Sequence, residues 1–241
     1  MSLHESAATG ARIPFVRPTM PAAHEVGQMF QEIGQANWYT NFGPMEQRFR
    51  AGITGYLGRD IGVATVANAT VGLIAALAAL LPRGDGSAGI AVASFTFAAG
   101  PQAIMWHGYR PEWIDVDPVS LQPSVDSCER ALAAGASVRA VLLTNTFGIG
   151  GADLDAWEAL CAREGIPLII DSAAGFGSRY PDGELLGHRG DCEVFSFHAT
   201  KPFGIGEGGA IVSHRPEVIE RVTCSRTSGS PIVRSAQPLP A

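Results

Sequence analysis

The sequence contains almost no lysine. Of its 17 basic residues, sixteen are arginine and the single lysine is Lys201. The 241-residue chain has a formal net charge of −6 and no cluster of basic side chains, so it lacks the positive surface that binds nucleic acids or anionic membranes. We therefore expect neither kind of partner, and the position of the one lysine needs a reason.

Paired cysteines and long apolar runs are also absent. The four cysteines, Cys128, Cys161, Cys192 and Cys224, lack the spacing of a metal site or a redox pair, so we expect buried thiols in a reducing compartment. No apolar run approaches the length of a membrane span, and the N-terminus MSLHESAATGARIPF has no apolar signal region. The sequence predicts a soluble, cytoplasmic protein.

Strand-like and helix-like segments alternate along the chain. Two helices are expected first, at about residues 22–35 and from Pro44 onward. Strands and helices then follow in turn: IGVATV, NATVGLIAALAALL, GIAVAS, PQAIMWHG, EWIDVD, VDSCERALAAG, VRAVLLTN, ADLDAWEALCAREG, IPLIID, CEVFSFH and GGAIVS. Apolar runs such as AVLLT fit strands covered on both faces. We predict an α/β domain with a mostly parallel sheet and helices on both faces.

Four residues at or near predicted strand ends could carry chemistry. Asp171 closes IPLIID, Ser196 lies near the end of CEVFSFH, Lys201 follows it, and Thr70 opens an apolar helix. Simpler explanations exist: helix caps for Asp171 and Thr70, a small strand residue for Ser196, and a surface charge for Lys201. However, ligands gather at the carboxyl ends of such strands. Arginine cannot replace lysine as a neutral amine nucleophile, so a lone lysine beside GIGEGG favours Schiff-base chemistry.

Together these residues predict a site for pyridoxal 5′-phosphate (PLP). This cofactor needs an amine for its aldehyde, a carboxylate facing its pyridine nitrogen, and an anion site for its phosphate. Lys201 would supply the amine and Asp171 the carboxylate, while Thr70 and Ser196 would bind the phosphate at a helix N-terminus. An aromatic ring over the cofactor is also expected, and SFTFAAG offers Phe97, unless that ring belongs to the core.

The stretch SFHATKPFGIGEGG resembles the lysine loop of the DegT/DnrJ/EryC1/StrS aminotransferases, PLP-dependent enzymes that aminate nucleotide-linked keto-sugars. NFGPMEQRF, ASFTFAAGPQAIMWHGYRPEWIDVDP and GADLDAWEALCAREGIPLIIDSAAGFGS resemble further segments of that family, so the resemblance covers roughly residues 12–225. It implies an aspartate-aminotransferase-like fold (PLP fold type I). Residues 1–225 would form the PLP-binding large domain with its N-terminal helical segment, and residues 226–241 a loosely ordered tail.

The resemblance also implies roles for individual residues. Lys201 would be the Schiff-base lysine and the base that moves the proton, Asp171 would pair with the ring nitrogen, and Phe97 would stack on the ring. The phosphate would be bound by Ala69 through its backbone, by Thr70 and by Ser196. The implied enzyme is a homodimer with active sites at the subunit interface. It would move an amino group from glutamate or glutamine to a nucleotide-linked keto-sugar.

Three departures from the family pattern keep other functions open. Asn68-Ala69-Thr70 stands where the family has Ser-Gly-Thr, Ala174 stands where it has Gln or His, and the usual C-terminal small domain is largely absent. Ala174 and the short C-terminus favour a truncated, non-catalytic homologue that binds PLP or a full-length partner. Another PLP enzyme of the same fold, such as a lyase or aldolase, is a third candidate. Lys201 argues against the dehydratases of the family, which have histidine there.

Overall fold

The computed structural model describes residues 18–227 of the chain. The helices are α1 (Ala23–Ala36), α2 (Pro44–Leu57), α3 (Ala69–Leu80), α4 (Ala99–Trp106), α5 (Val125–Ala133), α6 (Leu154–Glu164) and α7 (Pro216–Thr227), with a short 3-10 helix η1 (Thr146–Gly148). The strands are β1 (Gly62–Val66), β2 (Gly89–Ala93), β3 (Arg110–Ile114), β4 (Val138–Thr144), β5 (Leu168–Asp171), β6 (Cys192–Ser196) and β7 (Gly209–Ser213).

Each helix and strand predicted from the sequence is present, with two differences. The sequence patterns above do not predict α7, and β3 begins two residues before the segment EWIDVD and ends at Ile114. The predicted tail starts at residue 226, but α7 extends to Thr227. The rest of that tail, residues 228–241, lies outside the described residues.

The seven strands form one mixed sheet with the order β1-β7-β6-β5-β4-β2-β3. β2 is parallel to β3 and β4, β4 to β5, and β5 to β6. β7 is antiparallel to both β1 and β6. It is therefore the strand that reverses direction in this sheet, and the other six strands have their carboxyl ends at one edge.

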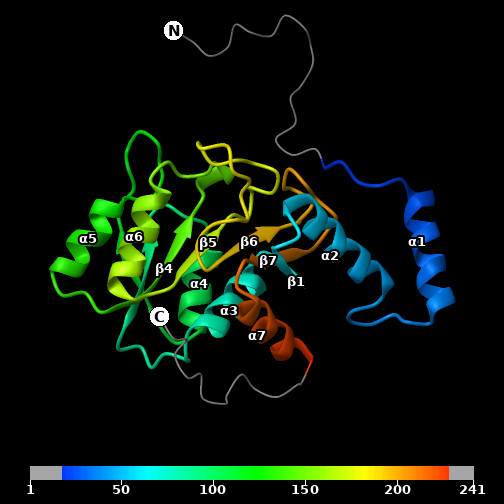
Figure 1. Cartoon of the computed structure of the whole chain (residues 1–241), viewed down its shortest axis with the longest axis horizontal. Coiled ribbons are helices and arrows are strands. Elements are labelled where there is room, and N and C mark those ends of the chain that lie inside the picture. Colours follow the sequence, from blue (N-terminus) through cyan, green and yellow to red (C-terminus); the bar gives the residue numbers. More distant parts are fainter. Residues whose placement is uncertain (1–17, 228–241) are drawn as a thin grey trace, which may run out of the picture.

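Helices cover both faces of the sheet. One set of buried side chains comes from the sheet and α3, α4 and α7, and the other from the sheet and α2, α5 and α6 (Figure 1). Every residue of β2, β5, β6 and β7 is buried, which explains their continuous apolar sequences. The predicted α/β fold, mostly parallel with helices on both faces, is confirmed.

The helix boundaries follow from local sequence. Pro44 opens α2, where its missing N–H costs nothing because the first N–H groups of a helix have no partner within it. Asn68 caps α3 with its side chain. Gly165 ends α6 in a left-handed conformation, φ 64°, that glycine adopts without strain.

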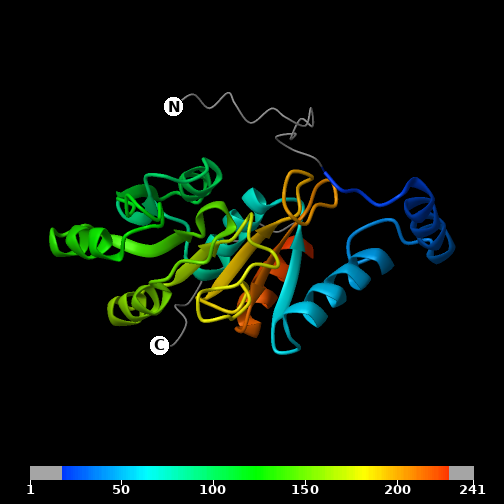
Figure 2. The ribbon, with the colours of Figure 1, turned by 90° about the horizontal axis from the view of Figure 1, so that it is seen from above.

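α1 lies at one end of the molecule, apart from the sheet, in both views (Figure 1, Figure 2). None of its residues is buried. Its apolar side chains Val26, Met29 and Phe30 are exposed by 49%, 42% and 65%. The sequence correctly predicts the helix, but its apolar face has little to pack against within the described residues.

Two further sequence expectations concern the burial of the thiols and the lack of a membrane span. Cys128, Cys161 and Cys192 are buried, as expected, but Cys224 on the outer helix α7 is exposed, so the prediction of a buried thiol is wrong there. Burial raises the pKa of Cys128 to about 11, which keeps that thiol protonated and unreactive. None of the described helices is long and apolar enough to cross a membrane.

Candidate active site

The residues predicted for the site come from neighbouring elements at one edge of the sheet. Asp171 ends β5 and Ser196 ends β6, and these strands are parallel neighbours. α3 follows β1 after a two-residue turn. β1 runs in the same direction as β6, because both are antiparallel to β7. The carboxyl ends of β1, β5 and β6 therefore meet at the edge where open α/β sheets bind ligands.

Asp171 is a buried carboxylate with spare acceptor capacity. It is 4% exposed, and its Oδ1 accepts a hydrogen bond from the backbone N–H of Ala173 at 3.1 Å. Its Oδ2 accepts none within residues 18–227. Burial raises the pKa of Asp171 to about 6, while the Ala173 hydrogen bond and the positive charge of Lys201 oppose that shift. No helix directly follows β5, so the alternative of a helix cap is wrong.

Ser196 lies close to the beginning of α3 because of one glycine. Ser196 and Val66 are both register partners of Gly209, on either side of β7. A Cβ at Gly209 would lie 2.8 Å from the carbonyl oxygen of Phe195 and 3.0 Å from the nitrogen of Ala69. Glycine thus allows the N-terminus of α3 to pack directly against β7. Ser196 itself is 6% exposed, and its Oγ accepts the His198 N–H at 3.3 Å.

The N-terminus of α3 has hydrogen-bond donors to spare. The side chain of Asn68 accepts the N–H of Val71 at 3.0 Å, and its carbonyl accepts that of Gly72. The alternative of Thr70 as the helix cap is therefore wrong. The backbone N–H groups of Ala69 and Thr70, and the Thr70 hydroxyl, make no hydrogen bond within the described range. Such a helix start can bind an anion such as a phosphate group.

Lys201 lies in a loop that is stabilised by backbone hydrogen bonds within the loop. Between β6 and β7, the N–H of Phe197 donates to Gly208 at 2.8 Å, and that of Ala199 to Gly206 at 2.9 Å. The backbone N–H of Lys201 donates to the carbonyl of His198 at 2.9 Å. Lys201 is half-buried, not an exposed surface charge, and its charge acts on Asp171.

Phe97 lies between β2 and α4, at the same edge of the sheet, but its ring is 77% exposed. The alternative that this ring belongs to the core is therefore wrong. Its neighbour Phe95 packs edge-on against Phe147, with ring centroids 6.0 Å apart, and Phe147 is 72% exposed. Exposed aromatic and aliphatic side chains thus gather beside the candidate site.

A cavity of about 1010 Å³ lies next to the lysine loop. α1 and α2 contribute Met29, Phe49 and Tyr56, and the loop contributes Phe203 and Glu207. Its lining is largely apolar. The sequence patterns do not predict this cavity, because it depends on how α1 and α2 sit beside the sheet.

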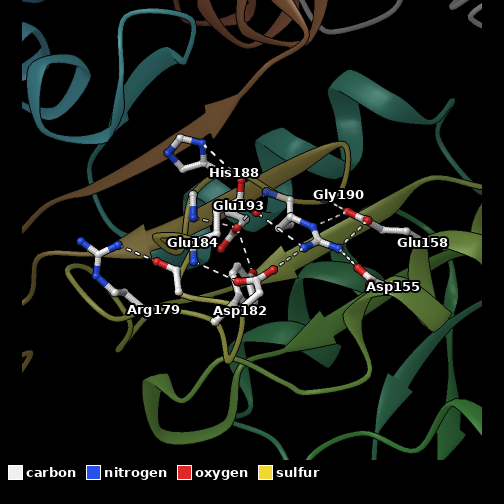
Figure 3. A network of polar contacts seen from close by, with 12 residues as sticks. Asp155, Glu158, Arg179, Asp182, Glu184, His188, Gly190 and Glu193 are labelled. Carbon is white, nitrogen blue, oxygen red and sulfur yellow. Dashed lines mark hydrogen bonds and ion pairs between the residues drawn. The ribbon is translucent and has the colours of Figure 1, made fainter.

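A buried polar network that the sequence patterns do not predict lies behind the site. Glu193, the second residue of β6, is 0% exposed. Ser172 and Tyr180 donate hydrogen bonds to its carboxylate, and Asn145 donates to both of these hydroxyl groups. Figure 3 shows Glu193 beside a wider group of polar contacts that includes Glu158 and Asp155. The signal was available: a charged residue inside the apolar strand CEVFS needs buried partners.

Comparison with known protein families finds a match over most of the chain. Residues 22–237 match the sequence model of the DegT/DnrJ/EryC1/StrS aminotransferase family. The chain is 47% identical over 221 residues to Protein Rv3402c of Mycobacterium tuberculosis, covering 91% of this chain and 54% of the relative. It is 30% identical over 206 residues to the dTDP-4-amino-4,6-dideoxy-D-glucose transaminase of Shigella dysenteriae, covering 86% and 54%. The chain therefore spans about half the length of the curated relatives it matches.

Solved structures show the same fold. A protein of Bacillus cereus assigned as a PLP-dependent aminotransferase superposes with a TM-score of 0.78 at 35% identity, covering 88% of this chain and 57% of the other. The structure of DesI in the presence of its TDP-sugar product gives a TM-score of 0.76 at 29% identity, covering 86% and 51%. The described residues therefore have the α/β fold of these aminotransferases.

Proposed function

Because the chain belongs to the DegT/DnrJ/EryC1/StrS aminotransferase family, we propose that it is a PLP-dependent aminotransferase that moves an amino group from glutamate or glutamine to a nucleotide-linked keto-sugar. The observation that carries the proposal is the single lysine of the chain, placed within electrostatic reach of a buried aspartate at the carboxyl edge of the sheet. Relatives support the substrate class, since one is a dTDP-sugar transaminase.

The residues present fit PLP. Asp171 is a buried residue whose Oδ2 accepts no hydrogen bond among residues 18–227, which suits a protonated pyridine nitrogen. The N–H groups of Ala69 and Thr70, which have no partner within the described residues, and the hydroxyl of Ser196 two strands away suit a phosphate. Bound PLP supplies an electron sink that stabilises negative charge on a substrate carbon.

The chain's own groups have distinct tasks in this proposal. Lys201 would hold the cofactor through Nζ and, when its amine is free, would move the proton at the substrate carbon, because a neutral amine can serve as nucleophile or as base. Asp171 would favour the protonated pyridine nitrogen through the attraction of a nearby opposite charge. Thr70 and Ser196 would bind the phosphate, and Phe97, which is exposed, would be available to pack against the ring.

We expect the protein to work as a homodimer in the cytoplasm. The exposed side chains Phe95, Phe147 and Ile149 lie beside the candidate site, where a second copy would bury them. Contiguous exposed apolar surface of this kind typically marks an interface.

The proposal is tested by adding PLP and recording the visible absorption band of the lysine-bound cofactor. Glutamate should then remove the band, and a panel of nucleotide-linked keto-sugars should yield an aminated product detectable by mass. Lys201→Ala should lose the band. Lys201→Arg is the matched control, because it keeps the positive charge near Asp171 but cannot bond to an aldehyde. A band in either variant would refute the role of Lys201.

One observation favours the second function, a homologue that binds PLP or a full-length partner without turnover. α1 buries no residue, and the cavity beside the lysine loop is lined largely by apolar side chains, so a partner could cover both. The same experiment separates the two functions. A band that forms with PLP but persists with glutamate supports the non-catalytic homologue, whereas loss of the band supports the aminotransferase.

A further inference from the structure

Glu193 and Asp171 lie on opposite faces of the sheet. Successive side chains of a strand alternate between faces. Val194 packs with α3 and α4, so its neighbour Glu193 faces the side of α5 and α6. Asp171 follows Ile170, which faces that same side, so Asp171 faces α3. Glu193 therefore cannot contact a cofactor on the α3 face, and any effect on Asp171 must pass through the chain between them.

The bonds around Glu193 have a fixed direction. Its Oε1 accepts from the hydroxyl of Tyr180 at 2.9 Å and from the N–H groups of Gly187 and Arg189 at 2.7 and 3.2 Å. Its Oε2 accepts from the hydroxyl of Ser172 at 2.6 Å. Four donors thus converge on the carboxylate, three at Oε1 and one at Oε2.

Asn145 completes the network and determines the direction in which the hydroxyl groups of Ser172 and Tyr180 donate. Its Nδ2 donates to Ser172 Oγ at 2.9 Å and to the Tyr180 hydroxyl at 3.2 Å. Each hydroxyl thus accepts from Asn145 and donates to Glu193. The Oδ1 of Asn145 accepts the N–H of Gly151, so the orientation of the Asn145 amide is also fixed. The chain of donors ends on the carboxylate of Glu193, on β6, the strand next to the one that carries Asp171.

Ser172 is the point where the chain leaves the sheet. β5 ends at Asp171, and the carbonyl of Ser172 accepts the N–H of Gly175 in the turn that follows. The backbone N–H of Asn145 donates to the carbonyl of Asp171 at 3.0 Å. The Ser172 side chain, bonded to Glu193, and the Asn145 N–H therefore hold the peptide group that follows the Asp171 Cα.

We propose that Glu193 is a positioning residue, which acts through Ser172 to orient the Asp171 carboxylate toward the pyridine nitrogen of PLP. This inference rests on the proposed function. It predicts that changes to the Ser172–Glu193 bond alter recognition of one atom, the ring nitrogen, more than they alter cofactor binding in general.

The test compares two ligands that differ at that atom: PLP and its analogue with carbon in place of the ring nitrogen. Their dissociation constants are measured for the full chain and for Glu193→Gln and Ser172→Ala. In Glu193→Gln, the three donors that face Oε1 keep the amide oxygen at that position. The NH₂ group then faces Ser172 Oγ and donates to it, so the direction of the hydrogen bond between residues 172 and 193 is reversed. Both variants should lower the preference for PLP about two- to tenfold, the loss of one typical hydrogen bond.

Tyr180→Phe is the matched control. It removes a donor from the same carboxylate but leaves the Ser172 bond in place. It should keep the wild-type preference for PLP, even though its melting temperature falls. If Glu193→Gln fails to fold, Ser172→Ala carries the test, because it deletes one hydroxyl from the other end of the bond.

The outcomes separate this inference from the proposed function. A wild-type protein without preference for PLP over the analogue, or an Asp171→Asn variant that retains it, overturns the role of Asp171. A preference that depends on Asp171 but is unchanged in Glu193→Gln and Ser172→Ala overturns the role of Glu193 alone. An equal loss in Tyr180→Phe shows a general structural effect and also overturns it.

Discussion

Among single residues, Asp171 shows a conflict between stability and chemistry. It is buried, it accepts one backbone hydrogen bond, and its pKa is raised from 3.8 to about 6. Ionising this carboxyl therefore costs folding free energy in the cofactor-free protein. The cost is present above the folded pKa and disappears as the pH falls toward the unfolded value, because the folded state then binds the extra proton.

Asp171→Asn should stabilise the cofactor-free protein at pH 8. The amide oxygen can still accept the Ala173 hydrogen bond, and the buried charge is gone. The gain should reach at most about 3 kcal/mol and shrink between pH 7 and pH 5. Thermal unfolding across this pH range measures it, with Glu220→Gln as an exposed control for net charge. A variant less stable than wild type at pH 8 contradicts the burial cost.

The predictability of the site also differs from residue to residue. Lys201, Asp171 and Ser196 could be proposed because strand ends and a lone lysine are visible in the sequence. The alternative of Thr70 as the cap of α3 is wrong, since Asn68 and Thr70 both suit that role and only geometry decides. The role of Glu193 was not predicted because its partners, such as Tyr180, come from a loop that shows no helical or strand periodicity.

Among secondary-structure elements, the contact between α3 and β7 positions the helix N-terminus that we propose binds phosphate. It depends on Gly209, where any side chain would press on the Asn68–Ala69 peptide. The close approach fixes the helix start relative to Ser196 across the sheet. The sequence GEGG therefore has a packing role in addition to its place after the lysine loop.

Gly209→Ala should cost about 1–3 kcal/mol of stability through overpacking. It should also weaken binding of PLP more than binding of pyridoxal, which lacks the phosphate, because α3 is pushed away from β7. Thermal unfolding and ligand titration measure the two effects. Gly55→Ala is the control, since a Cβ there meets nothing within 4 Å and alanine favours a helix interior. Equal weakening of both ligands contradicts the placement.

The element boundaries show where local patterns fail. α3 and β5 were predictable because their apolar runs have the length and punctuation of buried elements. β3 begins earlier than predicted because its start is determined by pairing with β2, in which Arg110 is the partner of Gly89. α7 carries the signals Pro216 and Glu217 at its start, yet its short, mostly polar sequence gives little apolar periodicity.

For the whole molecule, the distribution of exposed apolar side chains is uneven. Phe95, Phe147 and Ile149 gather at the carboxyl edge of the sheet, and Trp106 lies at the other end of α4. A homodimer formed around the candidate site would cover the first group only. Sequence patterns could not separate these groups, because both consist of apolar residues next to predicted element ends.

Phe147→Glu should shift the protein from dimer to monomer in size-exclusion chromatography with light scattering. A buried, unpaired carboxylate at an interface is costly. Trp106→Glu makes the same charge change on a side chain of similar exposure, 68% against 72%, and should leave the dimer intact. A monomeric wild type, or dissociation by the Trp106 variant alone, contradicts the placement of the interface.

Lys201 is the one side-chain amine among the 241 residues, which makes it a natural reporter for amine-directed dyes once the terminal amino group is accounted for. Its partial burial limits access, and any molecule occupying the site would shield it further. Labelling speed at this one position thus measures occupancy without an engineered tag.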